Sequence, residues 1–136
     1  MTRAYLAFTE KGLALAQKLA SALPGTVARC GHGGPGLADW AAEQFAHADA
    51  LIFVGAVGIA VRAIAPHCRS KAVDPAVVAL DECGHFAVPI LSGHLGGAND
   101  LARALAAVCG AVPVITTATD ANGVFAVDAW ARHQYC

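Results

Sequence analysis

The run Ala50–Val54 constrains the fold of this chain more than any other segment. It is apolar throughout, which is typical of a central strand in a parallel sheet, because such a strand is buried on both faces. A glycine-containing turn and a helical pattern follow it, and strand and helix patterns alternate along the 136 residues. This alternation predicts an α/β fold with three layers, α/β/α, built on a mostly parallel open sheet.

The other elements follow from local patterns. Two short apolar runs, 77–80 and 86–91, are separated by five residues, and that spacing predicts one β-hairpin within the sheet. Thr9 is placed to cap the helix that follows it. Further strands are expected at 5–8, 26–30 and 112–115. Further helices are expected at 37–47, after the turn at 55–58 and ending near 65–66, at 101–108, and from about 127 to the end. The length fits a single domain over residues 1–136.

Composition excludes several classes of protein. Hydrophobic residues make up 57% of the chain and charged residues 14%, which is typical of a globular core and excludes a disordered chain. A net charge of −1 gives no basis for nucleic-acid binding. The longest apolar run, 50–61, is shorter than the roughly 20 residues that cross a bilayer. Without a signal-peptide pattern the chain is expected to be cytoplasmic, and its five scattered cysteines do not have zinc-ligand spacing.

The strongest candidate site is the stretch Ser-Gly-His-Leu-Gly-Gly-Ala-Asn at residues 92–99, between a strand and a helix. Glycines at such a junction let the backbone approach a ligand and present amide groups to it. His94 lies among them, where a titratable group is useful, and we weigh a functional role and a structural one equally. Asn99 has an alternative role as a helix cap, and Ser92 as a partner for a loop amide.

Three other segments are candidates because we expect them at or beside the carboxyl ends of strands, where ligands bind in open α/β sheets. Residues 55–58 with Arg62 resemble a phosphate-binding turn only in outline, and tight strand-to-helix packing explains them as well. Lys71 and Asp74 are suited to bind an anion and accept a proton, although an Asp-Pro turn is slightly favoured. Residues 116–120 are rich in hydroxyls, which also close strand ends. We expect all of these segments to meet at one edge of the sheet.

Four blocks of sequence, in order, carry a family resemblance: residues 55–66, 71–78, 91–99 and 113–120. Together they strongly resemble the N-terminal and middle portion of the cobalt-precorrin-5A hydrolase family (CbiG) of anaerobic cobalamin biosynthesis. Residues 9–12 also resemble the start of that family. The family generally has a further C-terminal domain, so the resemblance implies that this chain is part of a longer protein or acts with a separate partner.

The resemblance implies hydrolytic opening of the δ-lactone of cobalt-precorrin-5A, with release of acetaldehyde to give cobalt-precorrin-5B. It implies no cofactor and no protein metal site, because cobalt arrives inside the substrate. Such a reaction needs a general base and donors for an oxyanion. Our hypothesis makes His94 the base, with Asp120 or Asp74 orienting it or substituting for it. The amides of residues 96–98 are the proposed donors to the oxyanion or to a substrate carboxylate.

We expect Arg62 and Lys71 to bind the peripheral carboxylates of the macrocycle. The other expected substrate-binding residues are Ser92, Gly93, Gly96, Gly97, Asn99, Thr116, Thr117 and Thr119. Two alternatives stay open. In one, the chain holds the macrocycle and a C-terminal domain performs the hydrolysis. In the other, the glycine loops bind a nucleotide, although the spacing of a dinucleotide fingerprint is missing. The sequence also leaves a homodimer open.

Overall fold

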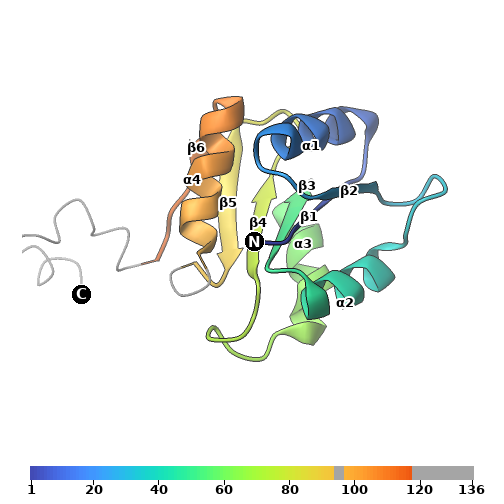
Figure 1. Cartoon of the computed structure of the whole chain (residues 1–136), viewed down its shortest axis with the longest axis vertical. Coiled ribbons are helices and arrows are strands. Elements are labelled where there is room, and N and C mark those ends of the chain that lie inside the picture. Colours follow the sequence, from blue (N-terminus) through green and yellow to red (C-terminus); the bar gives the residue numbers. More distant parts are fainter. Residues whose placement is uncertain (94–96, 118–136) are drawn as a thin grey trace, which may run out of the picture.

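The structure, a computed structural model, describes residues 1–93 and 97–117 and has three layers, with a six-stranded sheet between two pairs of helices (Figure 1). The elements are β1 (Arg3–Ala7), α1 (Glu10–Ala22), β2 (Thr26–Arg29), α2 (Leu37–His47), β3 (Ala50–Val54), α3 (Val57–Ile64), the 3₁₀ helix η1 (Ala65–His67), β4 (Ala76–Leu80), β5 (Phe86–Leu91), α4 (Ala98–Cys109) and β6 (Val112–Pro113). This confirms the predicted α/β fold.

The strand order is β2-β1-β3-β4-β5-β6. The strands β1 to β4 are parallel, whereas β5 pairs antiparallel with β4, as the predicted hairpin requires. Strand β6 is parallel to β5. We call the side of the sheet where β1 to β4 end the carboxyl edge, and the side where they begin the amino edge. Because β5 and β6 run the other way, both end at the amino edge.

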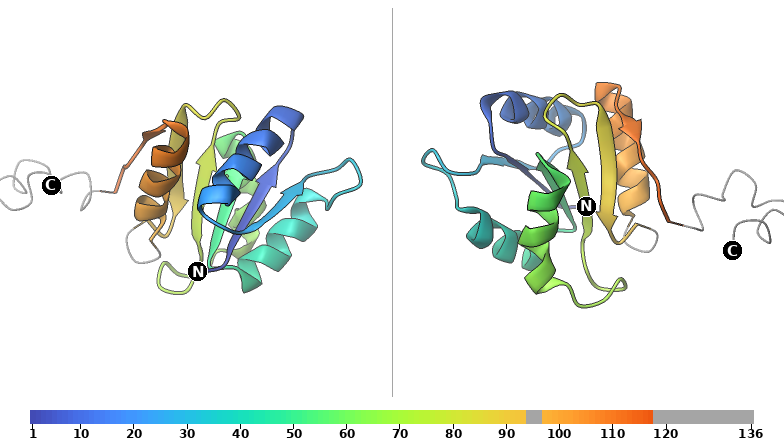
Figure 2. Two further views of the ribbon diagram at one scale, coloured as in Figure 1. Left: turned by 45° about the horizontal axis from the view of Figure 1, so that its top comes forward. Right: turned by 180° about the vertical axis from the view of Figure 1, so that it is seen from behind.

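The central strands are buried on both faces, which explains why their sequence is apolar throughout. Along β3, Ile52 and Val54 pack on the side of α1 and α4, and Leu51 and Phe53 pack on the side of α2 and α3. The side chain of Trp40 from α2 meets the Phe53 ring edge-on, with ring centroids 5.3 Å apart. The views in Figure 2 show one helix pair on each face of the sheet.

Local sequence patterns predicted some helix and strand ends correctly and misplaced others. Thr9 caps α1, since its hydroxyl oxygen accepts a hydrogen bond from the Gly12 amide at 3.0 Å. Helix α4 begins at Ala98, three residues before the expected start, because Gly97 is its N-cap. Strand β6 is shorter than the expected 112–115, although the amides of Val112 and Val114 both donate to the carbonyls of the neighbouring segment at His85 and Ala87.

The helix expected from residue 127 lies outside the described residues. Among the helices that the structure describes, none has the length and apolar character needed to cross a bilayer.

Candidate functional site

The predicted site segments divide between the two edges of the sheet. Residues 55–58 follow β3 and therefore lie at the carboxyl edge. Residues 71–74 precede β4, and residues 92–93 follow the reversed strand β5, so both lie at the amino edge. The expectation of one common edge is therefore wrong. Residues 55–58 lie at the carboxyl edge as expected, whereas residues 71–74 lie before the start of β4 and residues 92–93 lie at the end of β5, which is antiparallel.

Ser92 and Asp74 join two of these segments at the amino edge. The Ser92 hydroxyl donates to the Asp74 backbone carbonyl at 3.1 Å. Ser92 is buried and has φ +59°, a left-handed conformation that is uncommon for a serine. A buried residue in such a conformation is held there by its surroundings, and these residues gather at functional sites.

The carboxylate of Asp74 closes its own loop. Its two oxygens accept the Arg69 backbone amide at 2.9 and 3.1 Å, and only 8% of the residue is exposed. The Asp-Pro pair is thus part of a closed turn, the interpretation slightly favoured from sequence. Because the Asp74 carboxylate binds the Arg69 amide, it holds residues 69–74 in a closed loop. Asp74 also lines a hollow between this loop and α2.

A second set of contacts ties the start of α4 to the segment after β6. The Asn99 side-chain amide donates to the Thr117 hydroxyl oxygen at 2.8 Å. Asn99 is buried inside the first turn of α4, so its expected alternative role as the cap is wrong. A Cβ on Gly93 would lie 2.8 Å from Asn99 Oδ1 and 3.1 Å from Thr117 Cγ2, so glycine is needed there for this packing.

Backbone hydrogen bonds close the junction between β5 and α4. The Ala98 amide donates to the Ser92 carbonyl and the Asn99 amide to the Gly93 carbonyl, both at 3.0 Å. The Ala98 amide is therefore engaged, and its expected role as an oxyanion donor is wrong in this structure. Gly97 has φ +84°, a conformation that glycine adopts without strain.

The other predicted residues at this end of the molecule are exposed. Arg62 lies in the last turn of α3, which runs back from the carboxyl edge toward the amino edge, and Lys71 lies in the loop before β4 (Figure 2). Thr116 is exposed beside the half-buried Thr117. The positions predicted for His94, Gly96, Thr119 and Asp120 lie outside the described residues.

A groove at the amino edge was not predicted from the sequence. Two hollows of about 450 and 460 Å³ share the residues Phe45, Ala46, Val73, Asp74 and Pro75 between the end of α2 and the loop before β4. His67, Cys68 and Arg69 line the first hollow. The sequence signal for this wall was the pair of basic side chains at 67 and 69, which precede Asp74. Burial, and then the Asp74 charge, raise the pKa of the Cys68 thiol.

The carboxyl edge carries a separate, smaller hollow of about 370 Å³ lined by residues from the ends of β1, β3 and β4. Thr9 donates a short hydrogen bond to Glu82 at its rim. A Cβ on Gly55 would lie 2.8 Å from the Phe8 ring, which supports the close-packing interpretation of that glycine. At Gly58 no atom lies within 4 Å of the added Cβ, so packing does not require glycine there.

Near this hollow, the Lys11 ammonium lies 3.1 Å from the Cys83 sulfur, and that contact raises the pKa of Lys11. Within the described residues no group of three or more His, Cys, Asp or Glu side chains is placed to hold a metal ion.

Fold and site together define an α/β domain of the doubly wound type, with a glycine-rich junction after a reversed strand. The chain belongs to the family described as Cobalamin synthesis G N-terminal, whose model matches residues 39–120. The resemblance found in the sequence is therefore confirmed.

Individual relatives agree with this assignment. The chain is 47% identical over 137 residues to a cobalt-precorrin-5A hydrolase of Salmonella typhimurium, covering 92% of this chain and 38% of the relative. It is 46% identical to the cobalt-precorrin-5A hydrolase of Priestia megaterium, covering 60% of this chain and 22% of the relative. The crystal structure of a cobalamin biosynthesis protein G homolog from Sulfolobus solfataricus matches with a TM-score of 0.71 and 27% identity, over 85% of this chain and 36% of that one. The chain thus spans less than two fifths of the length of each.

Proposed function

We propose that this chain acts in the hydrolysis of cobalt-precorrin-5A and that its amino edge binds the macrocycle. The observation that carries the proposal is the 47% identity to the Salmonella typhimurium hydrolase over 92% of the chain. The structure adds that the segment around residues 92–99 is anchored on both sides. Ser92 is tied to Asp74, and Asn99 to Thr117. These contacts hold the described residues on either side of His94 in place.

The proposed chemistry follows from the lactone. Water attacks the lactone carbonyl and the ring C–O bond breaks, which leaves a free carboxylic acid and a hydroxyethyl group on the macrocycle. Loss of the hydroxyl proton and cleavage of the C–C bond to the ring then release this two-carbon unit as acetaldehyde, while the bonding electron pair stays with the macrocycle and takes up a proton. His94 is the proposed base that takes the proton of the attacking water, with Asp120 as its orienting partner. Arg62 and Lys71 are exposed cations near the amino edge, and they are proposed to bind peripheral carboxylates. Cobalt enters as part of the substrate, and we propose no cofactor of the chain's own.

The assay for this proposal is acetaldehyde release from cobalt-precorrin-5A. His94→Ala and Asp120→Asn are the test variants, and His32→Ala, which removes an exposed histidine from another loop, is the matched control. Loss of a general base lowers turnover by about 10²–10⁴-fold. We expect a loss in that range for His94→Ala and none for His32→Ala. Near wild-type turnover in both test variants would exclude this assignment.

A second candidate is supported by the share of the relatives that the chain spans. It covers 38% of the Salmonella typhimurium protein, so a chain of this extent is also suited to hold the macrocycle while the remaining portion performs hydrolysis. In that case the chain binds the substrate without releasing acetaldehyde, and adding the remaining portion as a separate polypeptide restores release. Release by the chain alone would exclude this candidate. A homodimer remains a proposal that a sedimentation measurement tests.

A further inference from the structure

One face of the sheet carries apolar side chains that the described helices leave exposed. Ala87 of β5 is buried in the cluster on the side of α1 and α4, and because side chains alternate along a strand, Phe86 and Val88 lie on the opposite face. Val112 of β6 is in register with Phe86 and lies on that face too. Phe86 is 52% exposed and Val112 is 55% exposed. We call Phe86, Val88, Ile90 and Val112 the β5–β6 face.

The backbone beneath this face is held in place by hydrogen bonds. The Asp81 carboxylate accepts the amides of His85 and Phe86 at 2.9 and 2.7 Å. The Val112 amide donates to the His85 carbonyl at 2.8 Å, which joins the two strands at this point. Single exposed apolar residues are ordinary, but a phenylalanine and a valine side by side on a fixed sheet face are typical of a docking surface.

The helix layer on this face has room for one more helix. The right-hand view of Figure 2 shows α3 in front of the sheet, with β5 uncovered beside it. Neighbouring strands are about 4.8 Å apart, so β5 and β6 extend the sheet about 10 Å beyond β4. Packed helices lie about 8–10 Å apart, so this extension accommodates one further helix beside α3. On the other face, α4 already contacts both β5 and β6.

The chain beyond Thr117 contains a segment of suitable composition. The Asn99 side chain holds Thr117 at the amino edge, where β5 also ends. The sequence predicts a helix from about residue 127. Four apolar residues of this predicted helix have the spacing of one helix face: Val127, Trp130, Ala131 and Tyr135. Such a helix needs an apolar surface to pack against.

The length of this part of the chain fits the distance to be covered. Nine residues, 118–126, precede the predicted helix and reach about 30 Å when extended. The six residues of β5 span about 20 Å, and a helix over residues 127–136 is about 15 Å long. The connection is therefore long enough for the helix to return along β5 and β6 toward Phe86.

We propose that residues 127–136 form a helix that docks on the β5–β6 face beside α3, with Trp130 among the residues that cover Phe86 and Val112. The helix completes the layer of α2 and α3 in the same way as α4 completes the layer on the other face. Docking also holds the chain beyond Asp120, whereas the bond between Asn99 and Thr117 holds the chain before it. This docking is independent of the proposed function, because it needs no substrate.

Hydrogen–deuterium exchange of the full chain tests the docking of residues 127–136. Phe86→Asp and Val112→Asp each place a charge on the β5–β6 face. Val73→Asp is the matched control, because Val73 is a valine that is 72% exposed in the loop before β4. We expect the amides of residues 127–136 to exchange about tenfold faster in either face variant than in wild type, and at the wild-type rate in the control.

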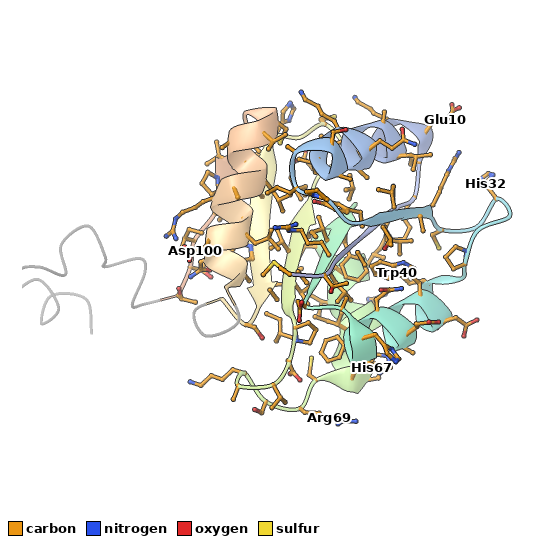
Figure 3. The ribbon with its side chains drawn as sticks, in the orientation of Figure 1. Glu10, His32, Trp40, His67, Arg69 and Asp100 are labelled. Atoms are coloured by element: carbon orange, nitrogen blue, oxygen red, sulfur yellow. The ribbon has the colours of Figure 1, made fainter. Side chains whose placement is uncertain are left out.

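Tryptophan fluorescence gives a second measurement and verifies that the variants are folded. Trp40 is 6% exposed between α2 and the sheet, so its emission reports on the core (Figure 3). The chain has two tryptophans, so the difference between each protein and its Trp130→Phe counterpart isolates the emission of Trp130. We expect acrylamide to quench Trp130 more strongly in Phe86→Asp than in wild type, whereas quenching of Trp40 is unchanged.

Three results would overturn this docking. If residues 127–136 exchange in wild type at the rate of an unfolded peptide, they form no docked helix. If they exchange slowly and neither face variant changes the rate, the helix packs elsewhere. If wild type sediments as a dimer that Phe86→Asp dissociates, and residues 127–136 exchange rapidly in both, the β5–β6 face binds a second copy of the chain.

Discussion

Replacement of Gly93 by alanine tests whether close packing positions the segment that begins at Ser92. The new Cβ would lie 2.8 Å from Asn99 Oδ1 and 3.1 Å from Thr117 Cγ2, distances at which the neighbours must move. Asn99 cannot move freely, because it is 1% exposed and its side-chain amide donates to Thr117 at 2.8 Å. Overpacking of this kind costs about 1–3 kcal/mol.

The matched control is the same substitution at Gly58. This glycine lies in α3, and no atom is within 4 Å of its added Cβ. Alanine in a helix is favoured over glycine by about 0.5–1 kcal/mol. Gly58→Ala is therefore expected to stabilise the protein while Gly93→Ala destabilises it.

Urea unfolding followed by circular dichroism measures both changes. With a slope of about 2 kcal/mol per molar urea, a loss of about 2 kcal/mol moves the midpoint down by about 1 M. Gly58→Ala is expected to move the midpoint up by about 0.25–0.5 M on the same slope. A midpoint for Gly93→Ala at or above that of wild type would refute the packing argument.

Further predictions concern backbone strain and one buried phenol. A Cβ added at Gly97 has no atom within 4 Å, but the new residue must adopt φ +84°. Gly97→Ala is therefore expected to lower the free energy of unfolding, measured with urea, by about 1–2 kcal/mol, and a smaller loss for Gly97→Asn identifies backbone strain as the cause. Ser92→Gly and Ser92→Ala both lose the hydrogen bond to the Asp74 carbonyl, but only glycine relieves the strain at φ +59°. The free energy of unfolding is therefore expected to be lower for the alanine variant by about 1 kcal/mol, and the reverse order would contradict this prediction. Burial raises the pKa of the Tyr5 phenol above its ordinary value of 10.0, against a smaller opposite effect of Arg3, and the phenol donates to the Leu23 carbonyl at 2.6 Å. Since the folded state favours the protonated phenol, the stabilisation by Tyr5 is present below pH 10 and is lost as the pH rises through the pKa of the folded state. Tyr5→Phe is expected to lower the free energy of unfolding by about 1 kcal/mol at pH 7 and to reduce the loss of stability at alkaline pH. An alkaline loss of stability equal to that of wild type would contradict this prediction.

Elements whose cause is local could be predicted from the sequence. The apolar run of β3 needs burial on both faces, and the structure provides it. The hairpin between β4 and β5 follows from the five-residue spacing, and the Thr9 cap from its place before a helical pattern. Each of these depends on residues close together in sequence, so pattern and structure agree.

The arrangement of the site depends on contacts that no local pattern contains. The hairpin reverses β5, and this reversal places residues 92–93 and the start of α4 at the amino edge, away from residues 55–58. Asn99 pairs with Thr117, and Ser92 with Asp74, each across 18 residues. The groove between α2 and the loop before β4 was missed for the same reason, because it forms only when α2 packs beside that loop.

The central claim, that the macrocycle binds at the amino edge, is tested most directly by hydrogen–deuterium exchange of the chain with and without cobyrinic acid, a stable cobalt corrinoid. Peptides that cover residues 68–74 and 92–99 are expected to exchange more slowly in the complex, whereas residues 55–58 at the carboxyl edge are expected to exchange at the same rate. Protection confined to residues 54–56 and 81–82, which line the hollow at the carboxyl edge, would contradict the account.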